Sequence, residues 1–190
     1  MKRKYELKAR AERQAQTRRR IVEAAVELHT TLGPGATSIS AIAERAGVQR
    51  HTVYAHFPDE DTLFGTCSAH WASQNPFPDP ATWQMEPDPE RRAAAALAAI
   101  YTWYESVESG LAVLLPYVEA TPERSQLLQA RRAQLVIIVD GLMVGRRRRR
   151  VVRAALGHAL AFETWRSLMR REGLSRPQAV DAMVRFVASV

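Results

Sequence analysis

The chain has 190 residues, of which 46% are hydrophobic, and it carries a formal net charge of +7. A chain of this size and composition can bury a core, which excludes a disordered protein. Cys67 is the only cysteine, which excludes an intrachain disulfide and a multi-thiolate metal site within one chain. The charged N-terminus is followed by no apolar segment, and no uncharged apolar stretch reaches about 18 residues. We therefore expect a cytoplasmic protein that is neither secreted nor embedded in a membrane.

The excess positive charge is concentrated near the N-terminus. Residues 1–57 hold 11 Lys and Arg against 5 Asp and Glu, whereas residues 58–190 hold 16 against 15. This asymmetry attracts a polyanion to one end of the molecule. Nucleic acid is the usual partner of such a surface, and an anionic membrane is the alternative.

Apolar residues at helical spacing predict the first helix. Ile21, Ala24, Ala25 and Leu28 follow an arginine-rich lead and would share one face. The sequence Gly33-Pro34-Gly35 cannot continue a helix, so we expect the helix to stop there.

Two short helices are predicted next, within residues 38–57. Ser38 can cap the first, and Gly47 ends it where a left-handed residue is needed. The second helix spans roughly residues 49–56 and is closed by Pro58. This arrangement is typical of a helix-turn-helix, in which a tight glycine turn joins two short helices and a preceding helix supports them. Its second helix enters the DNA major groove.

A domain boundary is predicted after the fourth helix. Asp59 caps this helix, which runs to about Trp71. Five prolines then follow between Asn75 and Pro89, too many for a continuous helix. The sequence therefore predicts an N-terminal basic arm and helix-turn-helix domain over residues 1–74, and a helical dimerisation and effector-binding domain over residues 75–190.

Helix signals continue through the second domain, and no convincing strand is found. Asp88 and Pro89 open a helix toward Val107, and Thr121-Pro122-Glu123 opens another through about Met143. We expect a short helix over residues 111–118, a long one over about residues 147–171, and a last one behind the capping box Ser175-Arg176-Pro177-Gln178. The predicted fold class is all-α, with about nine helices.

The segment TSISAIAERAGVQRHTVYAHFPDEDTLF resembles the DNA-binding domain of the TetR family of bacterial regulators. The resemblance covers about residues 17–71. Beyond it only the helical layout and the length match, because the C-terminal domains of this family diverge. The resemblance implies an all-α homodimer that binds a palindromic operator, represses by occlusion, and is released when a small molecule binds its C-terminal domain. It rests on Ile42-Ala43, Ala46-Gly47-Val48, Thr52, Tyr54, His56-Phe57 and Leu63 behind its acidic neighbours.

The resemblance also implies roles for single residues. Ser38 and Ser40 would approach phosphates, residues 49–52 would face the groove, and Tyr54 and His56 would hold the DNA backbone. Read without the resemblance, Tyr54 can also pack in the core and His56 can point inward. The basic residues through Arg20 are candidates for further phosphate or minor-groove contacts. The candidate DNA-binding residues are Ser38, Ser40, Gln49, Arg50, His51, Thr52, Tyr54 and His56.

Two further sets of candidates lie in the second domain. Aromatic side chains can wall an apolar effector pocket between helices, although plain core packing is an equal alternative. Helices near the end of a chain that are apolar on several sides suggest a partner helix, and core packing is again the alternative. The pocket candidates are Trp103, Tyr104, Tyr117, Phe162 and Trp165, and the dimer candidates are Leu156, Leu160, Met183 and Val187.

Other patterns give weaker signals. The run Arg146 to Arg150 suggests a second polyanion site, but consecutive residues point all around a helix, which favours a solvated loop or helix start. Cys67 and His70 lack a third donor, which favours a core thiol over a metal site, and we expect no metal or cofactor. No phosphate loop, paired-histidine motif or nucleophile elbow occurs, so we do not expect an enzyme. The alternatives are a helical small-molecule-binding protein or enzyme, a ligand-independent regulator, and an activator.

Overall fold

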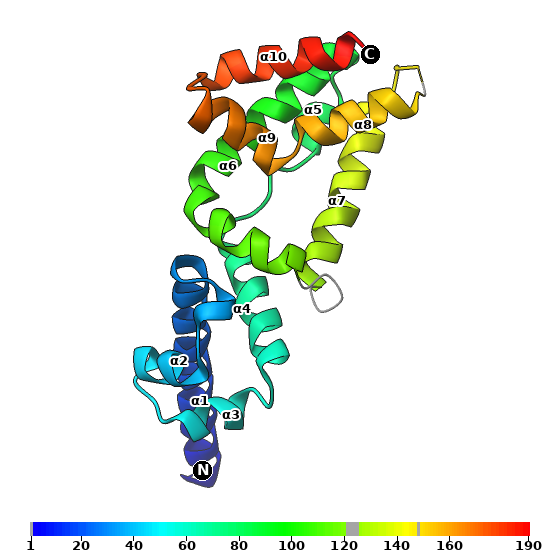
Figure 1. Cartoon of the computed structure of the whole chain (residues 1–190). Coiled ribbons are helices and arrows are strands. Elements are labelled where there is room, and N and C mark those ends of the chain that lie inside the picture. Colours follow the sequence, from blue (N-terminus) through cyan, green and yellow to red (C-terminus); the bar gives the residue numbers. More distant parts are fainter. Residues whose placement is uncertain (1, 121–125, 148) are drawn as a thin grey trace. The chain divides into compact units, whose positions relative to one another are not determined.

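The computed structural model describes residues 2–120, 126–147 and 149–190, and these residues contain helices and no strand (Figure 1). The predicted all-α fold is therefore confirmed. The chain divides into two compact units. Unit 1 comprises Met1–Asn75 and Ser109–Leu128, and unit 2 comprises Pro76–Glu108 and Gln129–Val190. Within the described residues, no helix combines the length and the apolar character that crossing a membrane requires.

Unit 1 is built around its first helix. Helix α1 (Lys2–Thr31) packs against α2 (Ile39–Ala46) and α4 (Glu60–Gln74), and α2 packs against α3 (Arg50–His56). A single 3-10 turn, η1 (Pro34–Ala36), connects α1 to α2. The core that these helices share includes Ile21, Ala25, Ile42, Ala43, Val53, Phe57, Leu63 and Cys67.

The helix boundaries in unit 1 follow the predicted signals. Gly33 has a φ of 89°, which a residue with a side chain rarely adopts, and α1 ends just before it. Asp59 Oδ1 accepts a hydrogen bond from the Thr62 N–H at 2.6 Å and so caps α4. This hydrogen bond lowers the pKa of the Asp59 carboxyl, which keeps the cap ionised.

The proline-rich segment contains a short helix, α5 (Ala81–Gln84), that the sequence did not predict. Trp83 in this helix is only 3% exposed, so the segment adds to the core of unit 2 as well as connecting helices. Asp88 then caps α6 as predicted, since its Oδ1 accepts from the N–H groups of Glu90 and Arg91 at 3.0 and 2.8 Å.

Helix α6 (Pro89–Ala120) is continuous, so the prediction of one helix toward Val107 and a separate short helix over residues 111–118 is wrong. The segment beyond residue 108 lies in unit 1, where Leu111, Leu114 and Val118 are buried on one helix face. Burial of this apolar face outweighs the hydrogen bond lost at Pro116, which lies inside the helix.

The predicted long helix over residues 147–171 is also wrong. Helix α8 (Arg150–Ala159) stops, and Ala161 is extended before α9 (Phe162–Arg166) and the π-helix η2 (Ser167–Arg171) begin. The hydroxyls of Tyr101 and Tyr104 each donate at 2.8 Å to the carbonyl oxygens of Ala159 and Leu160, respectively. These hydroxyls therefore give the carbonyl oxygens of Ala159 and Leu160 a hydrogen-bond donor where the helix is interrupted.

The last helices of unit 2 complete its core. Helix α7 is described as Gln126–Leu142, and the start predicted at Thr121-Pro122-Glu123 lies outside the described residues. Helix α10 (Arg176–Ala188) begins behind the predicted capping box, in which the Ser175 N–H donates to Gln178 Oε1 at 2.9 Å.

Candidate nucleic-acid interface

A tight turn between α2 and α3 fixes the geometry of the candidate interface. Gly47 has φ 65° and ψ 41°, and its N–H donates to the carbonyl oxygens of Ala43 and Glu44. The Val48 N–H donates to the same Ala43 oxygen at 2.9 Å. Because an L side chain is strained at such a φ, glycine is the residue that ends α2 here at low cost. Gln49 follows in an extended conformation and starts α3.

Helix α3 is held from one side and open on the other. Val53 is fully buried and Phe57 is 1% exposed, so these two side chains anchor the helix in the core of unit 1. The remaining candidates on this segment are accessible to a partner. Gln49, Arg50, His51 and Tyr54 are exposed, and Thr52 and His56 are half-buried.

Arg50 and Tyr54 interact on the accessible face of α3. Arg50 Nη2 donates to the Tyr54 hydroxyl at 3.3 Å, and the guanidinium carbon lies 5.6 Å from the centre of the Tyr54 ring. The hydrogen bond raises the pKa of Arg50, so its charge is retained at every physiological pH. Tyr54 is 39% exposed, so it is not a core residue in this structure. The remaining N–H groups of the Arg50 guanidinium can donate to a guanine edge or a phosphate.

Ser38 and Ser40 lie at the start of α2, and both are exposed. Ser38 Oγ accepts the Ala41 N–H at 3.1 Å, so Ser38 caps the helix as predicted. We expect Ser38→Ala to lower the free energy of unfolding by about 1 kcal/mol, because one N–H at the helix start loses its acceptor. Urea denaturation measures this loss. Ser40→Ala is the matched control, and equal losses in both variants would contradict the assignment of the cap.

Two arginines of unit 1 brace the interface without belonging to the predicted set. Arg45 of α2 pairs with Glu27 of α1, with Nη2 2.6 Å from Oε2 and Nε 3.0 Å from Oε1. The guanidinium carbon of Arg18 lies 4.6 Å from the centre of the Phe57 ring, just behind α3. These contacts join residues that are 18 and 39 positions apart, so no local pattern in the sequence indicates them.

A buried histidine and the single cysteine meet behind the helix-turn-helix. His29 Nδ1 lies 3.3 Å from Cys67 Sγ, and the thiol is also 3.2 Å from the Phe64 carbonyl oxygen. Burial lowers the pKa of His29 to about 4 and raises the pKa of Cys67 to about 11. Both groups are therefore neutral near pH 7, as the core position predicted for the thiol requires. Among the described residues, no group of three or more His, Cys, Asp or Glu is placed to hold a metal ion.

The aromatic candidates for an effector pocket divide between the two units. Trp103, Tyr104, Phe162 and Trp165 lie in unit 2, where the Tyr104 and Phe162 rings lie 5.6 and 5.2 Å from the Trp165 ring. Tyr104 and Trp165 are fully buried, so their packing is that of a core. Tyr117 belongs to unit 1, where its ring lies 5.7 Å from Phe64.

The dimer candidates lie mostly in the core of unit 2. Leu156, Leu160 and Val187 are at most 2% exposed, and Met183 is half-buried. Side chains that the chain itself covers have almost no area left to bury against a second copy. The apolar pattern indicated burial correctly, but the chain supplies the covering itself.

These features together define a helix-turn-helix protein, in which a short anchored helix offers polar side chains beside an arginine-rich helix. Residues 21–67 match the family model described as "Bacterial regulatory proteins, tetR family". A comparison with curated proteins found no match.

Several solved structures with a similar fold are described as TetR-family or TetR-like regulators. One is described as a TetR-family transcriptional regulator of Mesorhizobium loti, with 20% identity over 93% of this chain and 97% of that one, and a TM-score of 0.63. Another is a TetR-like regulator of Rhodococcus sp. RHA1, with 15% identity, coverage of 90% and 93%, and a TM-score of 0.65. The resemblance to the TetR family is confirmed: residues 21–67 match the model of its N-terminal domain, and the chain has a fold similar to that of these solved regulators.

Proposed function

We propose that the protein is a homodimeric transcriptional repressor that binds a palindromic operator and leaves it when a small molecule binds unit 2. The observation that carries this proposal is the α3 face, where Arg50, His51 and Tyr54 are exposed on a helix fixed by Val53 and Phe57. A helix anchored in this way can enter the major groove without losing its own packing.

The side chains divide into two roles in this proposal. Gln49, Arg50, His51 and Thr52 at the start of α3 read base edges, because amide, guanidinium, imidazole and hydroxyl groups match the donors and acceptors of the major groove. Ser38, Ser40, Tyr54 and His56 contact phosphates and fix the register of the protein on DNA. The exposed Arg10, Arg13, Arg19 and Arg20 of α1 add sequence-independent attraction.

Selection of bound genomic fragments by the purified protein tests the proposal. We expect one pseudo-palindromic motif, with half-sites about 34–36 Å apart, because two α3 helices related by a two-fold axis reach the groove one turn apart. Binding that shows no preference over random duplex, even in dilute buffer, would overturn it. Reporter assays on the selected promoter then separate repression from activation.

We propose a dimer face on the outward side of α8 and α10, in place of the buried leucines. Val151 is 49% exposed and Phe186 is 41% exposed, and the intervening positions of α8 carry the exposed Ala154, Gly157 and His158. The rings of His158 and Phe186 lie 6.1 Å apart, which joins the two helices into one surface. A Cβ added at Gly157 would meet nothing within 4 Å, so a partner helix has room to approach closely.

The exposed Ala154 tests this face. We expect Ala154→Glu to raise the dimer dissociation constant by about tenfold or more, because a charge would be buried at the interface without a partner. Sedimentation equilibrium measures the constant. Ala72→Glu on α4 is the control, since it places the same charge on an exposed helix of unit 1. A dimer that is equally strong in both variants places the interface elsewhere.

Effector release requires a ligand that prefers a dimer shape with the wrong half-site spacing. The aromatic side chains of unit 2, with Trp103 half-buried, support an apolar ligand of that kind. Such a ligand weakens operator affinity by some factor. By linkage, it binds free protein more tightly than operator-bound protein by the same factor. We retain the assignment of residues 1–74 to DNA binding and of residues 75–190 to dimerisation and effector binding as part of this proposal.

A further inference from the structure

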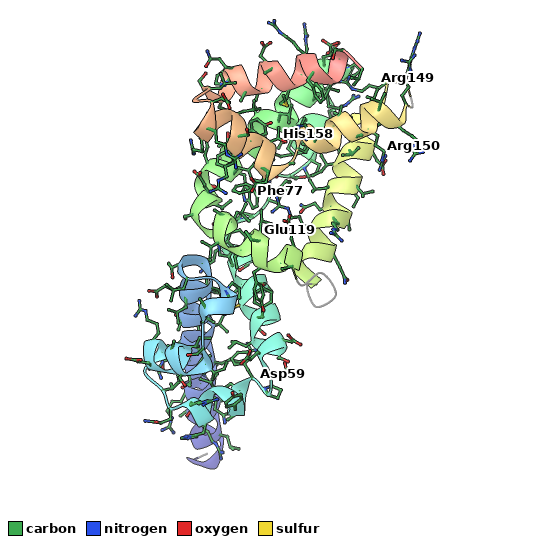
Figure 2. All side chains as sticks on the ribbon, in the orientation of Figure 1. Asp59, Phe77, Glu119, Arg149, Arg150 and His158 are labelled. Carbon is green, nitrogen blue, oxygen red and sulfur yellow. The ribbon has the colours of Figure 1, made fainter. Side chains whose placement is uncertain are left out.

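Arginines line a hollow where α7 leads into α8. We call this feature the arginine hollow, and it encloses about 560 Å³ in unit 2. Figure 2 labels Arg149 and Arg150 at the start of α8. The volume lies within the range of small-molecule sites, about 300–1,000 Å³. Its polar walls are made by Asp140, Arg146, Arg149, Arg150 and Arg153.

The lining of the arginine hollow contains four arginines and one acidic residue. Asp140 is the acid in its lining, and it already pairs with Arg153. Arg149 and Arg150 are exposed and form no ion pair with any described residue. The guanidinium groups of Arg149 and Arg150 repel each other, and an anion that binds between them would offset this repulsion.

Arg146 is held in place at one wall. Its Nη2 donates to the Pro89 carbonyl oxygen at 2.7 Å, while its Nε is buried without a partner among the described residues. Burial lowers the pKa of Arg146, and the nearby Arg92 lowers it further, against the opposing effect of Glu90 and Asp88. A guanidinium that is held in place and has an unbonded N–H can donate hydrogen bonds to an oxyanion.

The start of α8 adds to the same positive field. Arg149 stands at the N-cap but makes no capping hydrogen bond, and the first turn contains no acidic residue. The first N–H groups of a helix lack partners within the helix, and the helix dipole is positive at this end. The positive potential at the start of α8 therefore has three sources, which are the arginine side chains, the free N–H groups and the helix dipole.

We propose that the arginine hollow binds a small anion that carries two or more phosphate groups. Arg149 and Arg150 hold the phosphate oxygens in forked hydrogen bonds, with the N–H groups of α8 below them. A concave lining of this volume suits a compact polyphosphate better than a flat bilayer or a rod-like duplex. The proposal does not depend on the proposed DNA-binding function.

Titration of tripolyphosphate into the full chain tests the site. We use calorimetry at about 0.15 M salt, where exposed charges more than ~8 Å apart are screened. We expect saturable binding of one ligand per chain, and a loss of about tenfold or more in the double variant Arg149→Gln/Arg150→Gln. The double variant Arg132→Gln/Arg171→Gln removes the same charge from exposed positions elsewhere in unit 2, and we expect at most a twofold change.

Two further variants separate the site from other effects. Asp140→Asn removes the competing carboxylate, so we expect tighter binding by about threefold, a gain that a misfolded variant cannot give. Arg50→Ala in α3 should leave tripolyphosphate binding unchanged, so failure of the DNA-binding proposal would not affect this result. ATP and adenosine are titrated in parallel. Tighter binding of tripolyphosphate than of ATP indicates that the phosphates alone are preferred, and tighter binding of ATP indicates a whole nucleotide. Either result supports the site.

Three results would overturn the proposal. The first is heat that does not saturate, and the second is an equal loss in both double variants, which would indicate general charge attraction. The third is binding of phosphatidylglycerol vesicles that depends on Arg149 and Arg150 while tripolyphosphate does not bind. That result would identify a membrane contact instead.

Discussion

Replacing Arg50 by alanine is expected to lower operator affinity by about thirtyfold to twenty-five-thousandfold. A guanidinium that holds a base edge contributes about 1–3 kcal/mol at one half-site, and a dimer loses this contact twice, about 2–6 kcal/mol in all. Tyr54 holds the side chain at the α3 surface before DNA arrives, so little conformational freedom is lost on binding. Fluorescence anisotropy with the selected operator measures the affinity.

The matched control is Arg132→Ala, which removes one exposed positive charge in unit 2. We expect it to change operator affinity less than threefold at about 0.15 M salt, since distant charges are screened. Repeating the DNA selection with the Arg50 variant should relax the preference at one position of each half-site. Unchanged affinity and an identical selected motif would remove Arg50 from the interface.

Acidification is expected to destabilise unit 1 through His29. The pKa of His29 is about 4 in the folded chain, against 6.5 for an ordinary histidine. Because the folded pKa is lower, folding favours the neutral imidazole, and this stability is fully present above pH 6.5. It is lost as the pH falls from 6.5 toward 4, where the unfolded chain takes up a proton that the folded chain does not. The expected loss between pH 7 and pH 4 is about 3 kcal/mol.

Comparison with His29→Gln isolates this effect from the titration of carboxylates. The glutamine amide can still make a polar contact with the Cys67 thiol, but it does not titrate, so the variant should lose about 3 kcal/mol less than the wild type over the same pH interval. Urea unfolding at several pH values measures the difference. His51→Gln, which removes an exposed histidine of α3 outside the proposed dimer face, is the matched control and should keep the wild-type profile. Parallel profiles for the wild type and the His29 variant would show that His29 is protonated in the folded state.

Local chemistry made much of the fold predictable. Ser38, Asp59 and Asp88 each accept an N–H two or three residues ahead, and Gly47 adopts its left-handed conformation within the helix end itself. Such signals need only neighbouring residues, so they can be recognised in the sequence. The α2–α3 turn depends on them alone, which is why the position of α3 could be predicted.

Features that depend on distant residues could not be predicted. The break after α8 is satisfied by tyrosine hydroxyls 56 and 58 positions away, and the lowered pKa of His29 comes from burial by the folded core. An apolar stripe shows that a side chain such as Leu156 is buried, but not whether its own chain or a second copy covers it. In the same way, the sequence does not show whether the aromatic residues of unit 2 pack in a core or line a pocket.

The protected state of the only thiol has a practical consequence. Thiolate is the form that reacts with maleimides and disulfide reagents, and Cys67 is both 2% exposed and protonated up to about pH 11. A cysteine introduced at an exposed position outside α3, such as Ala69 on α4, can therefore carry a fluorophore while the native residue stays unlabelled. Binding and release of DNA can then be followed by energy transfer without first deleting a residue that the core needs.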